Sequence, residues 1–170
     1  MHAPLSPEQA GLDMEQELRL VWRRLKQDDT PWLDCCAMLR RHRLRPTRQR
    51  VVLARLLFAK GHRHVTAASL HDEAMQARIP MSLATVYNTL NNFTEAGLLR
   101  RITITSTISF FDTNTSHHHH FFIESEQALH DIAPDDVHIA QLPQIPDDAS
   151  VEGVDVVVRL RRTPTGRVRR

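Results

Sequence analysis

The chain has 170 residues, which is long enough to bury the core of one domain or of two small ones. No run approaches the ~18 apolar residues of a membrane-spanning helix, and the first residues give no indication of an export signal. The formal net charge of +2 conceals a basic stretch, RRHRLRPTRQR at 40–50, and a mostly acidic region at 124–152. The two cysteines, Cys35 and Cys36, are adjacent, so we expect free thiols and a cytoplasmic protein.

Five helices are predicted before residue 98. The first covers 6–27 and the second covers roughly 32–42, ending before Pro46. Serine and threonine N-caps mark the other three, which begin after Thr47, Thr66 and Ser82 and end near Ala59, Arg78 and Gly97. The basic stretch leads directly into the helix after Thr47. A phosphate-binding patch and an ordinary solvated face are both open interpretations of it.

After Gly97 the hydrophobic period changes from helical to alternating. LLRRITITS at 98–106 and TISFFDT at 107–113 are rich in β-branched and aromatic residues and predict the two strands of a hairpin. Helices followed by a hairpin are the layout of a winged helix-turn-helix. HHHHFFIES, QALHDI and GVDVVVRLR predict three more strands. In the last of these, Val154, Val156, Val158 and Leu160 point one way, so we expect a central, largely buried strand.

The helix predicted at 82–96 has an unusual composition. Its apolar face carries Leu83, Val86, Leu90 and Phe93. The other side carries small and uncharged hydrogen-bonding residues, with Tyr87 on the flank: Ala84, Thr85, Asn88, Asn91 and Asn92. Such groups suit insertion into a DNA major groove, where Asn can pair with adenine. The alternative is an amide-rich helix packed against another subunit, and Glu95 near its end is unfavourable beside phosphates.

Four consecutive histidines, His117 to His120, lie inside the chain. On a strand, alternate side chains face opposite ways, so His118 and His120 would share one face and His117 and His119 the other. Two such imidazoles can converge on one ion when other elements supply the remaining ligands. Imidazole suits Zn, Fe, Mn or Cu, and mixed nitrogen and oxygen ligands favour iron, manganese or zinc over copper(I). The alternative is a run of solvated surface histidines.

Three segments together resemble the ferric uptake regulator family of metal-sensing repressors. SLATVYNTLNNFTEAGLLRR resembles that family's recognition helix and wing start, LRPTRQRVVLARLLF its first basic helix, and HRHVTAASLHDEA the helix between. The resemblance covers about 33–162. It implies an α+β fold, in which a winged helix-turn-helix DNA-binding domain at 31–112 precedes a small α/β dimerisation and ligand-sensing domain at 113–162. A helical extension at 1–30 and a disordered basic tail at 163–170 would complete the chain.

The resemblance also implies partners and DNA contacts. The protein would be a homodimer, or a tetramer built from it, on double-stranded DNA with an AT-rich pseudo-palindromic operator. Tyr87 would contact bases, and Arg48 and Arg50 would lie near the backbone or minor groove. With the polar face of the helix, the predicted DNA-binding set is Arg48, Arg50, Thr85, Tyr87, Asn88 and Asn91. Many members have Arg directly after the Tyr, so Asn88 predicts a different preferred operator.

Ligand positions follow from the resemblance residue by residue. The family's interdomain metal site corresponds to His64, Asp112, His120 and Asp131. A second site on the other strand face would use His117, His119, His138 and Asp155. The family's usual CxxC pair after the histidines is replaced by FFIESE here. We therefore predict no cysteine-ligated structural zinc.

The missing CxxC, the segment FFDTNTSHHHHFF and the ending VDVVVRLRR resemble the iron response regulator branch, whose members read iron through haem. This implies haem at His118, His119 and His120. The branch's Cys-Pro-Trp-His-Asp motif is reduced to TPWLDC, which lacks both axial ligands. The predicted function is a DNA-binding transcriptional regulator of iron and haem homeostasis, sensing haem or a divalent metal (Fe, Mn or Zn). The alternatives are a repressor of this family that responds to metal without haem, a metalloenzyme and a metal store. The chain has no HExxH or nucleophile motif, so we predict that it is not an enzyme.

Overall fold

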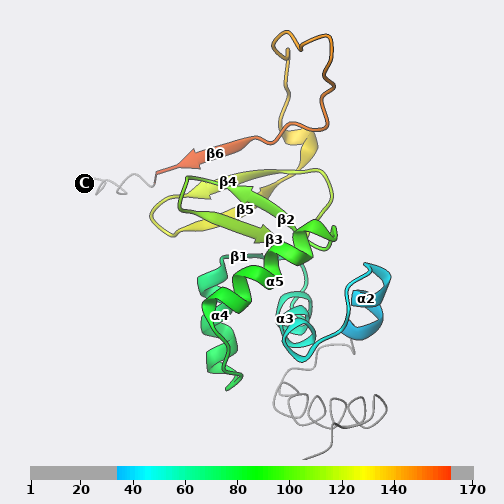
Figure 1. Cartoon of the computed structure of the whole chain (residues 1–170). Helices are drawn as coiled ribbons and strands as arrows, with labels where there is room; N and C mark the ends of the chain where they lie inside the picture. Colours follow the sequence, from blue (N-terminus) through cyan, green and yellow to red (C-terminus); the bar gives the residue numbers. More distant parts are fainter. Residues whose placement is uncertain (1–33, 162–170) are drawn as a thin grey trace, which may run out of the picture. The chain divides into compact units, whose positions relative to one another are not determined.

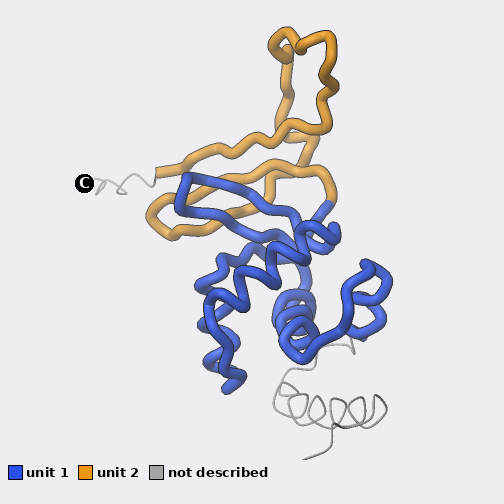
Figure 2. Tube along the Cα trace, viewed as in Figure 1, with its two compact units in different colours: residues 1–115 blue, residues 116–170 orange. Residues whose placement is uncertain are grey.

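The computed structural model describes residues 34–161. The chain divides into two compact units, 1–115 and 116–170, and Figure 2 colours the described residues of each unit blue and orange. The helix predicted at 6–27, the extension at 1–30 and the tail at 163–170 lie outside the described residues.

Unit 1 combines helices with a small sheet (Figure 1). Its elements are α2 (Cys35–Arg41), α3 (Arg48–Phe58), β1 (His64–Val65), α4 (Ala67–Gln76), α5 (Leu83–Glu95), β2 (Arg100–Thr103) and β3 (Ser109–Asp112). The strands lie in the order β1-β3-β2, and both pairings are antiparallel. Helix α4, the turn after it, α5 and the β2–β3 hairpin form the winged helix-turn-helix that the sequence predicts.

Local hydrogen bonds fix where the helices of unit 1 begin. The side chains of Thr47 and Ser82 accept hydrogen bonds from backbone N–H groups three residues on. Thr66 and Ser69 form a reciprocal capping box at the start of α4. Each cap satisfies a donor that the helix leaves unpaired and contributes ~1 kcal/mol. The three predicted N-caps are therefore confirmed.

The core of unit 1 lies between α3, α4 and α5. Val86, Leu90 and Phe93 of α5 are fully buried, as the helical period predicts. Leu83 was expected on the same face, but it is 48% exposed. It is the first residue of α5, almost a full turn before the first core residue. Thr89 is buried in its place at 7% exposure.

Unit 2 contains a three-stranded sheet. Strand β4 (His119–Ile123) pairs antiparallel with β5 (Ala128–Ile132) and parallel with β6 (Val157–Leu160). Within 116–161 the only helix is a short 3₁₀ turn, η1 (Pro134–Asp136), and an irregular connection leads from it to β6. The α+β fold class is confirmed for the chain.

The expectation of a central, buried last strand is wrong for the single chain. β4 occupies the middle of the described sheet, and β6 lies at its edge. Val158 and Leu160 are 36% and 38% exposed, because β6 is paired along one side only and its faces are not filled by the chain's own core. Alternation showed which residues share a face but not which strand occupies the centre.

Candidate metal centre and nucleic-acid interface

The histidine run enters β4 with the alternation that strand geometry predicts. The ring centroids of His118 and His120 are 4.6 Å apart, and those of His117 and His119 are 5.0 Å apart. His118, His119 and His120 are no more than 3% exposed, whereas His117 is exposed. Three of the four imidazoles are therefore buried, unlike a solvated surface run.

Within unit 2, Asp131 joins the face that carries His118 and His120. The β4–β5 register pairs His120 with Asp131, and His118 Nε2 lies 3.6 Å from Asp131 Oδ1. One potential ligand atom from each of these three residues lies within 4.8 Å of the others. Metal–nitrogen and metal–oxygen bonds of ~2.0–2.2 Å could bridge such a group after small side-chain movements. Two imidazoles and a carboxylate suit Fe, Mn or Zn.

Hydrogen bonds set the tautomers of His118 and His119. His118 Nδ1 lies 2.9 Å from the carbonyl oxygen of Ser116, which can only accept, so Nδ1 carries the proton. In the neutral ring, Nε2 then keeps the lone pair that faces Asp131, as in many metal sites with an oriented imidazole. His119 is the reverse, because its Nδ1 accepts from the backbone N–H of Val156 at 3.3 Å. The described geometry therefore prepares His118 as a ligand through Nε2 and occupies one nitrogen of His119.

The sequence assigned His118 to haem and not to the interdomain metal site. The structure instead places His118 Nε2 beside Asp131, one of the ligands predicted for the interdomain metal site. Its signal was present in the sequence, since His118 lies two residues before His120 and must share its strand face.

In unit 1, two predicted ligands lie opposite each other on neighbouring strands. His64 of β1 pairs in register with Asp112 of β3, and His64 Nε2 is 3.5 Å from Asp112 Oδ2. Asp112 is fully buried, and its Oδ1 accepts from the backbone N–H of Asn114 at 2.8 Å. One carboxylate oxygen is thus held by the backbone while the other faces the imidazole.

The second predicted site is brought together only in part. His117 and His119 are neighbours, whereas His138 and Asp155 are exposed residues of the irregular connection before β6. Among residues 34–161, the close group of three or more possible ligands forms around His118 rather than His117. The second site stays a prediction.

The polar side of α5 carries the side chains predicted to meet DNA. Tyr87 and Asn88 are exposed, while Thr85 and Asn91 are half-buried. The Tyr87 ring meets Phe111 of β3 edge-on, with centroids 6.3 Å apart. The Arg101 guanidinium carbon is 5.9 Å from the centre of each ring. The wing therefore holds the tyrosine ring in place.

The basic stretch at 40–50 lies against α5. Arg50 donates to Asn92 Oδ1 and to the carbonyl oxygen of Arg45, both at 3.1 Å. His42 Nδ1 donates to the carbonyl of Ala96 at the end of α5 at 2.9 Å. A groove of about 500 Å³ between these segments is lined by arginines together with Glu95. Arg48 is exposed, so it is better placed than Arg50 for a phosphate. Sequence reasoning missed His42, which carries no signal beyond its place in the basic stretch.

Both cysteines are free thiols, as expected. Burial raises the pKa of the Cys35 thiol to about 12, despite the opposing charge of Arg55. Cys35 therefore stays protonated near neutral pH and is a poor ligand for a metal or haem iron, since the thiolate is the ligand form.

Comparison with known sequences identifies the family of this chain. Residues 41–159 match the profile of the ferric uptake regulator family. The chain is 33% identical over 110 residues to the peroxide-responsive repressor PerR of Staphylococcus epidermidis, covering 64% of this chain and 69% of that protein. It is 38% identical over 92 residues to PerR of Staphylococcus aureus, covering 52% and 59%. The chain belongs to the ferric uptake regulator family.

Solved structures show that the fold is shared with other proteins. The ferric uptake regulator of Vibrio cholerae superposes with a TM-score of 0.61 at 20% identity, over 76% of this chain and all of that one. That of Pseudomonas aeruginosa, solved with manganese, gives 0.59 at 20% identity, over 78% and 100%. This member of the ferric uptake regulator family is a metal-responsive type of transcription regulator and not an enzyme. No helix within residues 34–161 is long and apolar enough to cross a membrane.

Proposed function

We propose that this family member is a dimeric, cytoplasmic repressor of iron and haem genes, whose affinity for an AT-rich operator depends on what the histidine cluster binds. Within the family, the sequence resembles the iron response regulator branch. One observation carries the proposal. A chain that exposes Tyr87 and Asn88 on a winged helix also buries His118 and His120 beside a carboxylate.

The small-ion form of the site would draw on both units. His118, His120 and Asp131 supply three donors in unit 2, and His64 and Asp112 supply two in unit 1. A closed metal site takes four or more protein ligands, which exceeds the number of side chains in either group alone. We propose that one Fe, Mn or Zn ion takes ligands from both groups and so ties the DNA-binding unit to the dimerising unit. A related manganese uptake regulator has been solved with zinc bound, which supports this choice of ions.

Haem would need a different arrangement of the same residues. The porphyrin fills the equatorial positions of iron, so the protein supplies only one or two axial ligands. His118, His119 and His120 are nearly inaccessible, so a porphyrin reaches them only when neighbouring residues move apart. We propose that haem and the small ion exclude each other, with the ion supporting the DNA-binding form and haem releasing it.

A repressor that responds to metal without haem is the second candidate. It is favoured by the burial of the cluster, which matches an ion better than a porphyrin. The haem response distinguishes the two candidates.

The test measures operator affinity by fluorescence anisotropy for the ion-free protein and after addition of Mn²⁺, Zn²⁺ or haem. We expect Mn²⁺ or Zn²⁺ to tighten binding and haem to weaken it, each by the ~1–3 kcal/mol typical of coupled sites. The triple variant His118→Ala/His119→Ala/His120→Ala should lose both responses and keep basal DNA binding. His130→Ala, at an exposed position that belongs to neither predicted metal site, is the control. A triple variant that still lost its operator on haem addition would place the haem sensor elsewhere.

The exposed face of β6 is expected to form part of the dimer. Val158 and Leu160 present apolar side chains on an edge strand, where a partner can cover them. Val158→Asp with Leu160→Asp should shift the protein to monomer in sedimentation velocity. Met75→Asp, which changes a residue 48% exposed in unit 1, should not. A charged β6 that left the dimer intact would exclude this face from the interface.

A further inference from the structure

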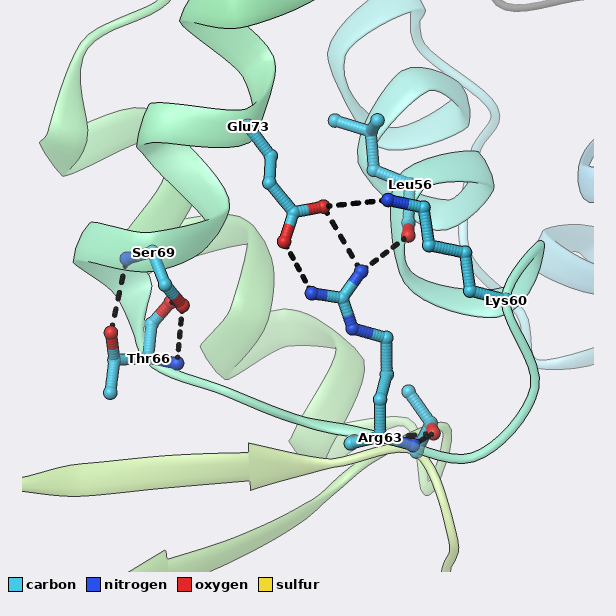
Figure 3. A network of polar contacts seen from close by, with 7 residues as sticks. Leu56, Lys60, Arg63, Thr66, Ser69 and Glu73 are labelled. Carbon is cyan, nitrogen blue, oxygen red and sulfur yellow. Dashed lines mark hydrogen bonds and ion pairs between the residues drawn. The ribbon is translucent and has the colours of Figure 1, made fainter. Parts of the chain in front are cut away.

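Arg63 binds two helices of unit 1 through its side chain (Figure 3). Its Nη1 donates to the carbonyl oxygen of Leu56 at 3.2 Å and to Glu73 Oε2 at 3.0 Å, and its Nη2 donates to Glu73 Oε1. Leu56 lies in the last turn of α3, where carbonyl groups lack partners from the helix itself. Glu73 lies on α4, so one guanidinium joins the end of α3 to the middle of α4.

The backbone of Arg63 is tied to the strand that carries Asp112. Its N–H donates to Thr113 Oγ1 at 2.8 Å, and the N–H of Thr113 donates to its carbonyl oxygen at 3.1 Å. Arg63 directly precedes His64, and Thr113 directly follows Asp112. These bonds extend the β1–β3 pairing at the place where the two predicted ligands face each other.

The short segment between Arg63 and α4 is held in place by burial and by hydrogen bonds. Val65 is 1% exposed, and the reciprocal Thr66–Ser69 bonds, both 3.0 Å, fix the start of α4 immediately after it. A shift of the His64–Asp112 edge must therefore move Arg63, and through it both helices. Helix α4 in turn packs against α5, the helix predicted to read DNA.

We propose that Arg63 is a positioning residue that couples the His64–Asp112 pair to the DNA-reading helices. This rests on the proposed function, since it requires operator affinity to respond to a metal ion. Arginine suits the task because its planar fork donates in two directions and binds a carboxylate through two bonds, which a lysine ammonium cannot reproduce. The pair is only about one-fifth exposed on each side, so it is partly shielded from solvent screening.

The experiment compares three variants of the full chain. Arg63→Met keeps the aliphatic stem and removes every guanidinium bond. Lys60→Met is the matched control, because the Lys60 ammonium also approaches Glu73, at 3.7 Å, but its side chain is 55% exposed. Arg63→Lys restores the charge with a poorer geometry. Each variant is measured for thermal unfolding, for Mn²⁺ affinity by competition with a metal-binding dye, and for operator affinity with and without Mn²⁺.

For Arg63→Met we expect Mn²⁺ affinity and ion-free operator affinity within about threefold of wild type. The Mn²⁺-dependent gain in operator affinity, about 5- to 150-fold in wild type for a typical coupling, should fall below about threefold. Lys60→Met should keep the full gain, and Arg63→Lys should recover part of it.

If both methionine variants fold, two results would overturn the proposal. A folded Arg63→Met protein with the full wild-type gain would show that Arg63 carries no coupling. Loss of the gain in Lys60→Met to the same extent would show that any charge near Glu73 matters equally. If wild type itself showed no Mn²⁺ dependence, the proposed function would fail as well, and that result is distinguished by the wild-type measurement alone. If Arg63→Met did not fold, the decision would pass to Arg63→Lys, where a full wild-type gain refutes the need for the guanidinium fork.

Discussion

Tyr87 offers the sharpest test of the proposal that α5 reads DNA, because the ring and the hydroxyl of its side chain can be removed separately. The ring meets Phe111 edge-on and lies under Arg101. At 39% exposure, the residue still presents a surface outward. We predict that Tyr87→Phe leaves folding unchanged and weakens operator binding, whereas Tyr87→Ala weakens both.

The magnitudes follow from these contacts. An aromatic pair contributes ~0.5–1.5 kcal/mol and an exposed cation–π contact ~0.5–1 kcal/mol, so Tyr87→Ala should lower the free energy of unfolding by ~1–2.5 kcal/mol. Loss of the base contact adds ~1–3 kcal/mol in operator affinity. Tyr87→Phe would remove the hydrogen bond proposed between the hydroxyl and the operator, worth ~0.5–1.5 kcal/mol, which is about a two- to tenfold loss of affinity.

Urea unfolding and fluorescence anisotropy on one operator duplex measure the two quantities separately. The reasoning would be refuted if Tyr87→Phe bound the operator as tightly as wild type while Tyr87→Ala lost affinity. That outcome would mean that Tyr87 supports the wing through its ring and does not use its hydroxyl in recognition.

Three further predictions concern single side chains. Arg48→Ala should reduce the slope of log affinity against log salt by ~0.9, as expected for one lost phosphate contact, while Arg48→Lys should keep it; equal slopes for both would argue against phosphate contact. Burial opposes ionisation of Glu73, but bonds and charge from Arg63, with the charge of Lys60, lower its pKa below 4.5. A lowered folded pKa stabilises the fold above the unfolded value, so the loss of melting temperature in Glu73→Gln should shrink as pH falls below 4.5, and a constant difference would contradict this. The pKa of Cys35 is raised rather than lowered, so its contribution to the free energy of unfolding should be fully present below pH 9.0. That contribution should be lost as pH rises from there toward 12, and Cys35→Ala should remove this part of the decline in stability.

Much of unit 1 could be predicted because its signals are local. Thr47, Thr66 and Ser82 cap helices through bonds that span only three residues, so the sequence alone contains both partners. The β2–β3 hairpin joins two alternating segments that are close in the chain. The pairing of His118 with His120 follows from the two-residue period of a strand, whatever that strand packs against.

The candidate site was predictable only to the extent that family resemblance aligned its residues. His64, Asp112, His120 and Asp131 came from that alignment and not from any local period. The proximity of His118 to Asp131 depends on the β4–β5 register, which brings together residues 13 positions apart. The tautomer of His118 depends in turn on a carbonyl that only the folded turn places beside its ring.

The sequence by itself therefore determined the helix starts, the hairpin and the faces of the histidine run, because each depends on neighbours within a few residues. Only the tertiary structure decided that β4 and not β6 is the central strand of the unit 2 sheet. It also decided that Arg50 bonds Asn92, 42 positions away, and that Arg63 joins Leu56 to Glu73. An arginine can reach many partners, and which one it meets is fixed by how the helices pack, a choice that no local pattern of residues encodes.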